Sequence, residues 1–281
     1  MDQPTDRLIA SCEWRDKFLT TVKSMGDWPI LLSGGMDSGT ILAAALALGR
    51  APDCYSFRIG NIDHQDVRVS RQMCAAYSLR HVVVNLPRDQ ESLIGDIQRI
   101  MVMHRSSGKA AIQCCHPMLY LAAELQKNAV EKVYIGTGGI VEDNRKCAVM
   151  LAKYGELAAR KYRAENLVVR GNPNSATRRM HETLEHYGVE GLEPFTYPDF
   201  ASYSLGLDMA EINWPKIKGI AVRAFPEFWL TNKWYRKNSP LQVNSHIREW
   251  HDTLLKTSLN PNRRYKSVIG VYNELFRNLG L

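Results

Sequence analysis

Short apolar runs that alternate with helical patterns constrain the fold of this chain more than any other feature. The runs end in glycine or in other turn residues, and stretches with helical spacing separate them. The expected strands are Ile30–Leu32, Cys54–Ile59, His81–Leu86 and Val130–Ile135. Strands that alternate with helices indicate βαβ units and a parallel sheet. We therefore expect an α/β fold built on a doubly wound parallel sheet.

The pattern changes after about residue 150, where helical stretches follow one another and no further strand is expected. These helices are expected around residues 151–165, 174–187, 199–212, 215–225, 243–257 and 266–279. We predict two parts: an α/β core over residues 1–150, and a helical half over residues 151–281 that packs on the core and completes its active site.

Composition limits the partners and the location that we expect. Lys and Arg number 36 against 29 Asp and Glu, a formal net charge of +7, which suits anionic partners such as nucleotides or nucleic acid. The longest apolar run, Ile41–Leu48, is far shorter than the roughly 20 residues of a membrane span. No secretory signal pattern opens the sequence, and the six cysteines show no C-x-x-C spacing. We therefore expect a cytoplasmic protein with reduced thiols and no membrane contact.

The segment Ile30–Ser38 carries the clearest chemical signal, because a strand, a glycine turn and a helix start follow one another there. Gly34 and Gly35 let backbone N–H groups approach an anion closely, and the dipole of the following helix adds positive potential. Ser33 and Ser38 add hydroxyl donors to phosphate oxygens. The segment therefore predicts a site for the phosphates of a nucleotide.

Asp37 would be misplaced beside phosphate alone, and a bridging magnesium ion explains its presence. The loop is not a Walker loop, since its spacing differs and no Lys follows the second glycine. The whole string S-G-G-x-D-S between strand and helix resembles the signature of the PP-loop ATP pyrophosphatases, which release pyrophosphate from ATP while adenylating a substrate. This resemblance implies ATP and Mg²⁺ as cofactors, with Asp37 as one magnesium ligand.

Further segments resemble the synthetase domain of asparagine synthetase and of β-lactam synthetase, in order through most of residues 5–250. Ser56–Gly60 resembles the second strand of that domain, whose backbone reads the adenine edge. By the same likeness, Leu31 and Ile59 would flank the adenine base. Pro117–Leu121 matches the helix before the fourth strand.

Two later segments resemble catalytic segments of that family. Gly188–Phe195 matches the form G-V-E-x-x-x-P-F, which implies that Glu190 is the catalytic glutamate. Lys216–Phe225 resembles the family's K-x-x-L-R-x-x-F helix, which implies that Lys218 contacts phosphate. Without this context, Glu190 would be an exposed turn glutamate and Lys218 a solvated charge.

A third segment, Trp234–Lys237, resembles the family's W-R-x-K segment. It implies that Lys237 is the catalytic lysine if one residue is deleted, and Arg236 takes the role if the gap lies elsewhere. The implied reaction has two steps. A carboxylate attacks the α-phosphorus of ATP while magnesium, Lys218 and Lys237 neutralise the departing pyrophosphate. Ammonia or an amine then attacks the acyl-adenylate, and Glu190 accepts its proton.

The loop after the fourth expected strand departs from the family pattern. Gly136 and Gly138 keep the family's glycines, which implies contact with the nucleotide, but Ile140–Val141 occupies the family's acidic positions. We expect either Glu142 or Asp143 to supply the second magnesium carboxylate from further along the loop. The neighbouring substrate pocket is then different too, and aspartate is not the expected substrate.

No glutaminase domain precedes Ser33 in this sequence. We therefore expect the nitrogen to come from free ammonia, from an amine or from a partner such as a glutaminase. His181 and His186 stand five residues apart, which puts them on different faces of a helix, so we expect surface or core histidines rather than zinc ligands.

Two other functions stay open from the sequence. In one, the acceptor is a base of tRNA or DNA, which the net charge favours. In this reading a basic face would contact nucleic acid, although a solvated helix face explains the same residues; they are Arg160–Arg163, Arg170, Arg178 and Arg179. In the other, the chain is a non-catalytic nucleotide-binding subunit, an interpretation that rests on the altered acidic loop alone.

Overall fold

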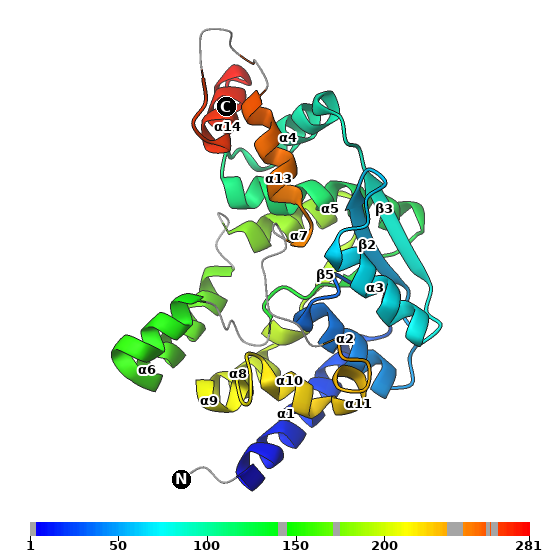
Figure 1. Ribbon diagram of the computed structural model, residues 1–281, viewed down its shortest axis with the longest axis vertical. Coiled ribbons are helices and arrows are strands. Elements are labelled where there is room, and N and C mark those ends of the chain that lie inside the picture. The colour runs from blue at the N-terminus through cyan, green and yellow to red at the C-terminus, as the bar shows by residue number, and fades with distance from the viewer. Residues whose placement is uncertain (1–3, 140–144, 171–174, 235–243, 257–258, 260–263) are drawn as a thin grey trace.

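The computed structural model describes residues 4–139, 145–170, 175–234, 244–256, 259 and 264–281. Five parallel strands form one sheet in the order β3-β2-β1-β4-β5 (Figure 1). The strands are β1 (Ile30–Leu31), β2 (Cys54–Ile59), β3 (His81–Leu86), β4 (Lys132–Tyr134) and β5 (Glu190–Leu192). The expected α/β fold with a parallel sheet is confirmed.

Helices make up most of the remaining described chain. Those of the first half are α1 (Pro4–Met25), α2 (Met36–Ala47), α3 (Gln65–Ala76), α4 (Gln90–His104), α5 (Lys109–Lys127) and α6 (Arg145–Arg170), the last kinked at Gly155. Those of the second half are α7 (Ala176–His186), α8 (Pro198–Gly206), α9 (Met209–Ile212), α10 (Gly219–Ala224), α11 (Pro226–Trp229), α13 (Ile247–Asp252) and α14 (Val268–Asn278), with short 3-10 turns at Pro194–Thr196 and Thr253–Lys256. Among the described residues, no helix combines the length and apolarity that a membrane span requires.

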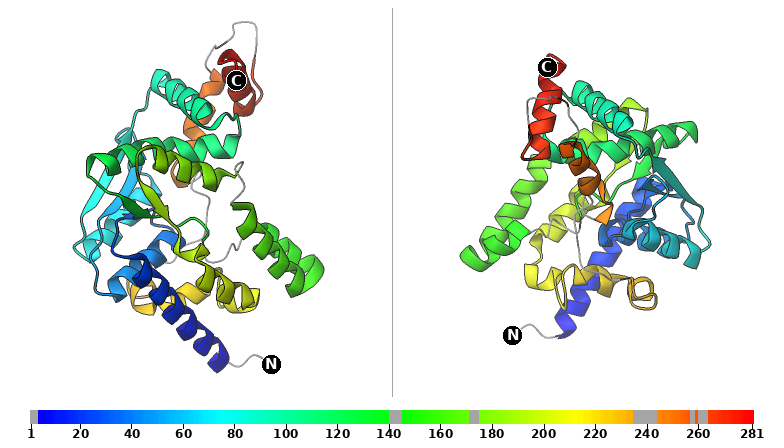
Figure 2. Two further views of the ribbon diagram at one scale, coloured as in Figure 1. Left: turned by 180° about the vertical axis from the view of Figure 1, so that it is seen from behind. Right: turned by 45° about the horizontal axis from the view of Figure 1, so that its top comes forward.

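Side chains alternate between the two faces of the sheet, as the period-two geometry of a strand requires. Ile30 and Leu32 join a core with α1, α2, α8, α10 and α11, whereas Leu31 joins a second core with α4, α5, α7, α13 and α14. The two groups of helices lie on opposite faces of the sheet in both views (Figures 1 and 2). Apolar burial on both faces explains why the strands read as short continuous apolar runs.

The second half of the chain adds a strand that the sequence did not predict. β5 pairs with β4 in parallel, with Glu190 opposite Lys132 and Leu192 opposite Tyr134. The expectation of no strand beyond residue 150 is therefore wrong. A three-residue Glu-Gly-Leu segment is too short to show a period, and its pairing with β4 is a tertiary interaction. The division of the chain at residue 150 stays a prediction.

A buried chain of polar groups ties the last two helices to the rest of the fold. Asp96 accepts hydrogen bonds from Tyr120 Oη and His116 Nε2, at 2.6 and 3.2 Å. His116 Nδ1 lies 2.9 Å from His251 Nε2, and His251 Nδ1 lies 2.5 Å from Tyr272 Oη. Every contact is satisfied when each ring donates from Nε2 and accepts at Nδ1.

We expect the protein to unfold at lower urea concentrations as the pH falls from 7 to 5. Burial lowers the pKa of His251 well below its ordinary value, and burial lowers the pKa of His64 and of His81 to about 4. The unfolded chain binds protons at these histidines below a pH of about 6.5, whereas the folded chain does not. Acid therefore favours the unfolded state.

Urea midpoints measured by circular dichroism across this range test the expectation. The fall in midpoint should be smaller in a His251→Gln variant and unchanged in a His186→Gln control, since His186 is exposed. A midpoint in the native protein that does not depend on pH would contradict the buried neutral state.

Candidate nucleotide-binding site

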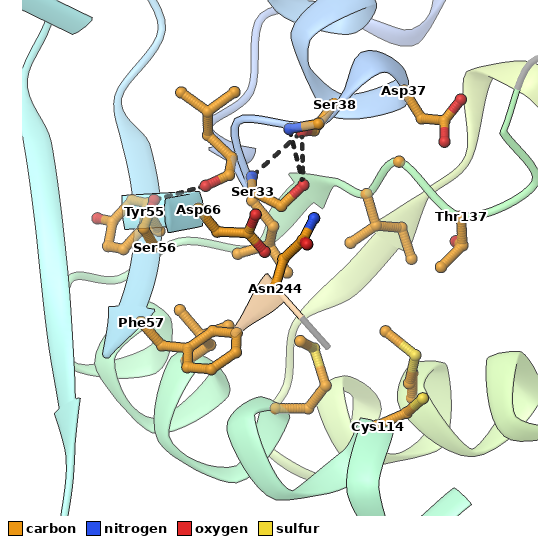
Figure 3. A pocket seen from close by; sticks show the side chains of 18 of the residues that line it. Ser33, Asp37, Ser38, Tyr55, Ser56, Phe57, Asp66, Cys114, Thr137 and Asn244 are labelled. Carbon is orange, nitrogen blue, oxygen red and sulfur yellow. Dashed lines mark hydrogen bonds between the residues drawn. The ribbon is translucent and has the colours of Figure 1, made fainter. Parts of the chain in front are cut away.

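A cavity of about 290 Å³ lies at the carboxyl ends of β1, β2 and β4 (Figure 3). Its lining comes from the segment after β1, from β2 with the start of α3, and from the segment after β4. Side chains from α5 and α7, together with Asn244, close its other side. In open α/β sheets, ligands bind beside the strand ends where the strand order reverses, and β1 occupies that position here.

The loop between β1 and α2 shapes one wall of the cavity. Gly34 has a φ of +63°, and a Cβ at this position would lie 2.9 Å from the backbone oxygen of Asp66. The Ser38 hydroxyl lies 3.1 Å from the backbone nitrogen and 3.1 Å from the hydroxyl of Ser33. Gly35 caps α2 without a side-chain hydrogen bond. The start of this helix therefore offers N–H groups to an anion, as the sequence predicted for a phosphate loop.

Asp37 and Lys218 form an ion pair beside this loop. Lys218 is 3% exposed, and its Nζ lies 2.6 Å from both carboxylate oxygens of Asp37. Its backbone N–H donates to Asn213 Oδ1 over 2.8 Å at the start of α10. Gly139 lies so close to Asp37 that a Cβ there would overlap the carboxylate. Two residues to which the sequence assigned separate tasks, a magnesium ligand and a phosphate contact, thus touch each other.

The donor set around Asp37 fits a magnesium ion that is shared with a nucleotide. Among the described residues, no three His, Cys, Asp or Glu side chains are arranged to hold a metal ion. Mg²⁺ commonly binds one or two carboxylates and takes its other ligands from phosphates and water. Asp37 lines the cavity next to the phosphate loop, so it can supply such a carboxylate.

The loop after β4 approaches the phosphate loop closely. A Cβ at Gly136 would lie 2.8 Å from the backbone nitrogen of Ser38, and Gly138 has a φ of +88°. Gly136 lines the cavity, as expected. The predicted magnesium ligands Glu142 and Asp143 lie outside the described residues, as do Lys237 and its alternative Arg236. The roles of all these residues stay predictions.

The base-binding side of the cavity uses a different part of β2 from the one expected. Leu31 lines the cavity, but β2 contributes Ser56 and Phe57 rather than Ile59. The reason is strand length: β1 ends at Leu31, which pairs with Tyr55, so the cavity opens at this level of β2. Ile59 lies further along the strand, where it bridges to Ile62.

His64 lines the same cavity and was not predicted from the sequence. It is 4% exposed, and neither ring nitrogen has a partner in hydrogen-bond geometry. Burial and the nearby His246 lower the pKa of His64 to about 4, so its imidazole is neutral at physiological pH. A neutral imidazole offers one donor and one acceptor to a ligand. No sequence pattern indicated this role, because an isolated histidine after a strand has no signature.

The structure does not bring Glu190 to the cavity. Glu190 begins β5, its side chain is 58% exposed, and its carboxylate lies 2.7 Å from Lys132 Nζ. Glu193 follows the carboxyl end of β5 instead, where its side chain is 14% exposed. Its Oε1 accepts a hydrogen bond from the hydroxyl of Thr137, which lines the cavity, and lies 3.3 Å from His181 Nε2.

Glu193 was not singled out from the sequence, because Glu190 is the glutamate that aligns with the third position of the form G-V-E-x-x-x-P-F. Glu190 lies at the amino end of β5, whereas Glu193 lies just beyond its carboxyl end, where the cavity is. The expected catalytic role of Glu190 therefore stays a prediction that this geometry does not favour. A signal was present in the same string, since Glu193 directly precedes Pro194 and follows the last residue of the strand.

The basic residues singled out in the sequence do not form an open cationic face. Arg163 is fully buried and donates to the backbone oxygens of Leu205 and Leu207. The others form ion pairs or hydrogen bonds: Arg160 with Glu156 and Asp208, Lys161 with Glu165, Arg178 with Glu182 and Glu185, and Arg179 with Ser106. Nearby acids thus offset much of the positive charge of this segment, while the side chain of Arg170 lies outside the described residues.

Fold and site together define a nucleotide-binding α/β protein with a PP-loop at the carboxyl edge of its sheet. Residues 13–139 match the family model described as asparagine synthase. The resemblance to the PP-loop ATP pyrophosphatases drawn from the sequence is thereby confirmed over these residues, which make up less than half of the chain. The match supports an ATP-using enzyme of this superfamily and leaves the reaction open.

Two curated relatives are similar over short stretches. A 7-cyano-7-deazaguanine synthase from Paramagnetospirillum magneticum is 43% identical over 51 residues, which cover 18% of this chain and 22% of the relative. One from Frankia casuarinae is 41% identical over 58 residues, which cover 20% of this chain and 25% of the relative. The matches thus span about a quarter or less of the length of these relatives.

Two solved structures are distantly similar. An NMN synthetase from Francisella tularensis has a TM-score of 0.35 and 15% identity, covering 90% of this chain and 99% of that chain. The U34-tRNA thiolase NcsA from Methanococcus maripaludis, solved with its 4Fe-4S cluster, has a TM-score of 0.36 and 14% identity, covering 94% and 78%. Scores this low carry no argument about function.

We expect a Gly34→Ala variant to bind ATP at least about tenfold more weakly. An alanine in the left-handed region costs roughly 1 to 2 kcal/mol, and its Cβ would also press on the backbone of Asp66. The loop must therefore leave the geometry that forms the phosphate site. Isothermal titration calorimetry with ATP measures the effect. Gly95→Ala serves as the control, because no atom lies within 4 Å of a Cβ added there; equal affinities of the two variants would contradict the role of the loop.

Proposed function

We propose that this protein is an ATP-dependent, AMP-forming ligase that adenylates a carboxylate and transfers it to ammonia or an amine. The observation that carries the proposal is the ion pair between the buried Lys218 and Asp37, which stands beside a phosphate loop and whose aspartate lines the cavity. An ATP-binding protein without chemistry to perform needs no buried lysine at this point. Reaction at the α-phosphorus requires positive charge there, because pyrophosphate leaves with additional negative charge.

In the first step, a carboxylate oxygen bonds to the α-phosphorus of ATP and pyrophosphate leaves with the electrons of the broken P–O bond. The Ser33 and Ser38 hydroxyls and the start of α2 hold the phosphates. Asp37 would hold Mg²⁺ together with the phosphates, and the ion would supply neutralising charge. Lys218 Nζ, which lies 2.6 Å from the Asp37 carboxylate beside the phosphate loop, is placed to donate to a phosphate oxygen.

The other wall of the cavity suits an intermediate that water would destroy. Met118, Leu121, Ile135 and Met180 line it with apolar side chains. An acyl-adenylate reacts readily with water, and an apolar lining that displaces water lengthens its lifetime. A nitrogen nucleophile then has time to react in the second step.

A second candidate function places the carboxylate on a nucleobase. The relatives named 7-cyano-7-deazaguanine synthase support it, since the product in their name is a modified purine-like base. The charge pairing of the Arg160–Arg163 segment argues against a nucleic-acid polymer as the partner at that face. A free base-type carboxylate therefore ranks above tRNA or DNA among these acceptors. The nitrogen source, including a glutaminase partner, and a cytoplasmic location remain predictions.

A screen for pyrophosphate release tests the proposed function. Mg-ATP is incubated with the protein, ammonium chloride and one candidate substrate at a time: amino acids and deazaguanine carboxylates as carboxylates, and tRNA and duplex DNA as nucleic acids. We expect AMP and pyrophosphate in equal amounts with the correct carboxylate. Formation of ADP, or ATP binding without pyrophosphate release from any carboxylate, would contradict the ligase and favour another role.

We expect a Lys218→Met variant to release pyrophosphate at least about a hundredfold more slowly, the usual effect of removing one group that stabilises charge in a transition state. The thioether fills the buried space without a charge. Lys161→Met serves as the control, since the Lys161 side chain is 79% exposed and far along α6. Rates are measured with a coupled pyrophosphate assay at saturating ATP. A rate in Lys218→Met equal to that of the control would remove Lys218 from the reaction.

A further inference from the structure

We propose that Glu193 receives the nitrogen nucleophile as an ammonium ion and takes one of its protons, with His181 and Thr137 as positioning residues. This inference rests on the proposed function and assigns the second substrate class, ammonia or a primary amine, to a defined carboxylate. Three contacts carry it: the hydrogen bond from Thr137, the proximity of His181 and the low exposure of Glu193.

The backbone fixes the place of Glu193. β5 ends at Leu192, whose backbone oxygen accepts a hydrogen bond from Ile135 N over 2.9 Å. The 3-10 turn Pro194–Thr196 follows directly, and the Thr196 hydroxyl donates to the backbone oxygen of Glu193 over 3.1 Å. Glu193 therefore stands between a paired strand and a rigid turn, at the edge of the sheet that holds the cavity.

His181 is held against this carboxylate by its packing on β5. A Cβ at Gly191 would lie 2.8 Å from His181 Nδ1 and 3.1 Å from Ile135 Cδ1. The absence of a side chain at Gly191 thus leaves the space that the imidazole occupies. Because the ring packs on the strand, its Nε2 meets Glu193 Oε1 at 3.3 Å. We infer that a larger residue at position 191 would move His181 away from the carboxylate.

Thr137 connects Glu193 with the phosphate end of the cavity. It belongs to the loop after β4, whose Gly136 packs on Ser38 and whose Gly139 packs on Asp37. A ligand at the phosphate loop and a ligand at Glu193 would therefore be neighbours on one short loop. This placement suits a group that acts on the acyl end of the adenylate rather than on pyrophosphate.

Glu193 lies next to the cavity, because it accepts a hydrogen bond from Thr137, which lines it. A partly buried carboxylate in such a place is suited to bind a cation. An ammonium ion supplies the charge and the N–H donors that such a carboxylate pairs with. One proton passes from the ammonium nitrogen to Glu193, and the freed lone pair forms the C–N bond with the acyl carbon. The bond from that carbon to the phosphate oxygen breaks, and AMP leaves with its electrons. The second proton on nitrogen goes to the departing phosphate oxygen, which completes the amide.

Glu190 offers a matched comparison, because it is the glutamate that the sequence assigned to this role. Glu190 begins β5, is largely exposed and pairs with Lys132, whereas Glu193 follows the last residue of the strand. Glu193→Gln and Glu190→Gln change the same charge by the same chemistry. Thermal unfolding of both variants, followed by circular dichroism, shows whether the fold is retained.

The experiment separates the two steps of the reaction. Exchange of labelled pyrophosphate into ATP, with the carboxylate found by the screen and no amine, reports the first step. AMP formation on addition of ammonium chloride reports the second. We expect Glu193→Gln to keep its exchange rate within a few-fold of the native enzyme and to lose amine-dependent AMP formation at least about a hundredfold, as is usual for a lost general base. Glu190→Gln tests the competing assignment: native rates in both assays support Glu193, whereas loss of amine-dependent AMP formation in Glu190→Gln alone would overturn the proposal.

Hydroxylamine provides a readout that a merely structural role would not change. It is largely neutral at neutral pH and needs no proton removed before it attacks. The defect of Glu193→Gln should therefore be much smaller with hydroxylamine than with ammonium chloride, and a His181→Gln variant should show the same pattern more weakly. Equal defects with both nucleophiles, loss of pyrophosphate exchange, or native rates in Glu193→Gln would each overturn the proposal.

The proposed function and this inference fail in different ways. If no carboxylate supports pyrophosphate exchange in the native enzyme, the ligase is wrong. Saturation-transfer nuclear magnetic resonance then tests Glu193 by itself, with methylammonium chloride as the probe and Mg-ATP present. Binding to the native protein and to Glu190→Gln, but not to Glu193→Gln, supports the ammonium site. Equal signals in all three proteins, or none in the native protein, contradict it.

Discussion

The parallel pairing of β1 with strands on both of its sides is the constraint on which the site depends. Ile30 pairs with Cys54 of β2 and with Tyr134 of β4, although β1 has only two residues. This central position sends the chain out of the sheet at Leu32, directly into the phosphate loop. It also brings the loop after β4 against the start of α2, because neighbouring parallel strands end at the same edge.

A second constraint joins segments that lie far apart in the sequence. Lys218 and Asp37 are separated by 181 positions, yet their side chains meet beneath the phosphate loop. Removing one partner of a buried ion pair leaves a charge without compensation, which destabilises proteins strongly. The second half of the chain therefore contributes a charge that compensates the partly buried carboxylate of Asp37 in the first half.

Local chemistry decided which parts of this protein could be predicted from its sequence. The loop from Ser33 to Ser38 was predictable because its glycines, hydroxyls and acid act within one turn. Glu193 was not, since its role depends on where β5 ends, and a three-residue strand has no readable period. Ile59 does not line the cavity for a similar reason, because the level at which β1 ends is set by pairing, and its expected contact with adenine stays a prediction. His64 had no pattern at all, and only its burial beside the cavity reveals it.

The ion pair of Asp37 and Lys218 has a consequence for how substrates enter. Before any nucleotide arrives, the ammonium group of Lys218 already occupies the carboxylate that a metal ion would take. Under the proposed function, a magnesium ion bound with ATP would compete with Lys218 for Asp37, so it would bind less tightly than to a carboxylate without a cation beside it. Lys218 would then be available to the phosphates, where negative charge accumulates during the reaction. The positive charge that the proposed reaction needs is thus already held beside the phosphate loop by Asp37, and binding of ATP with its metal ion would separate Lys218 from that carboxylate.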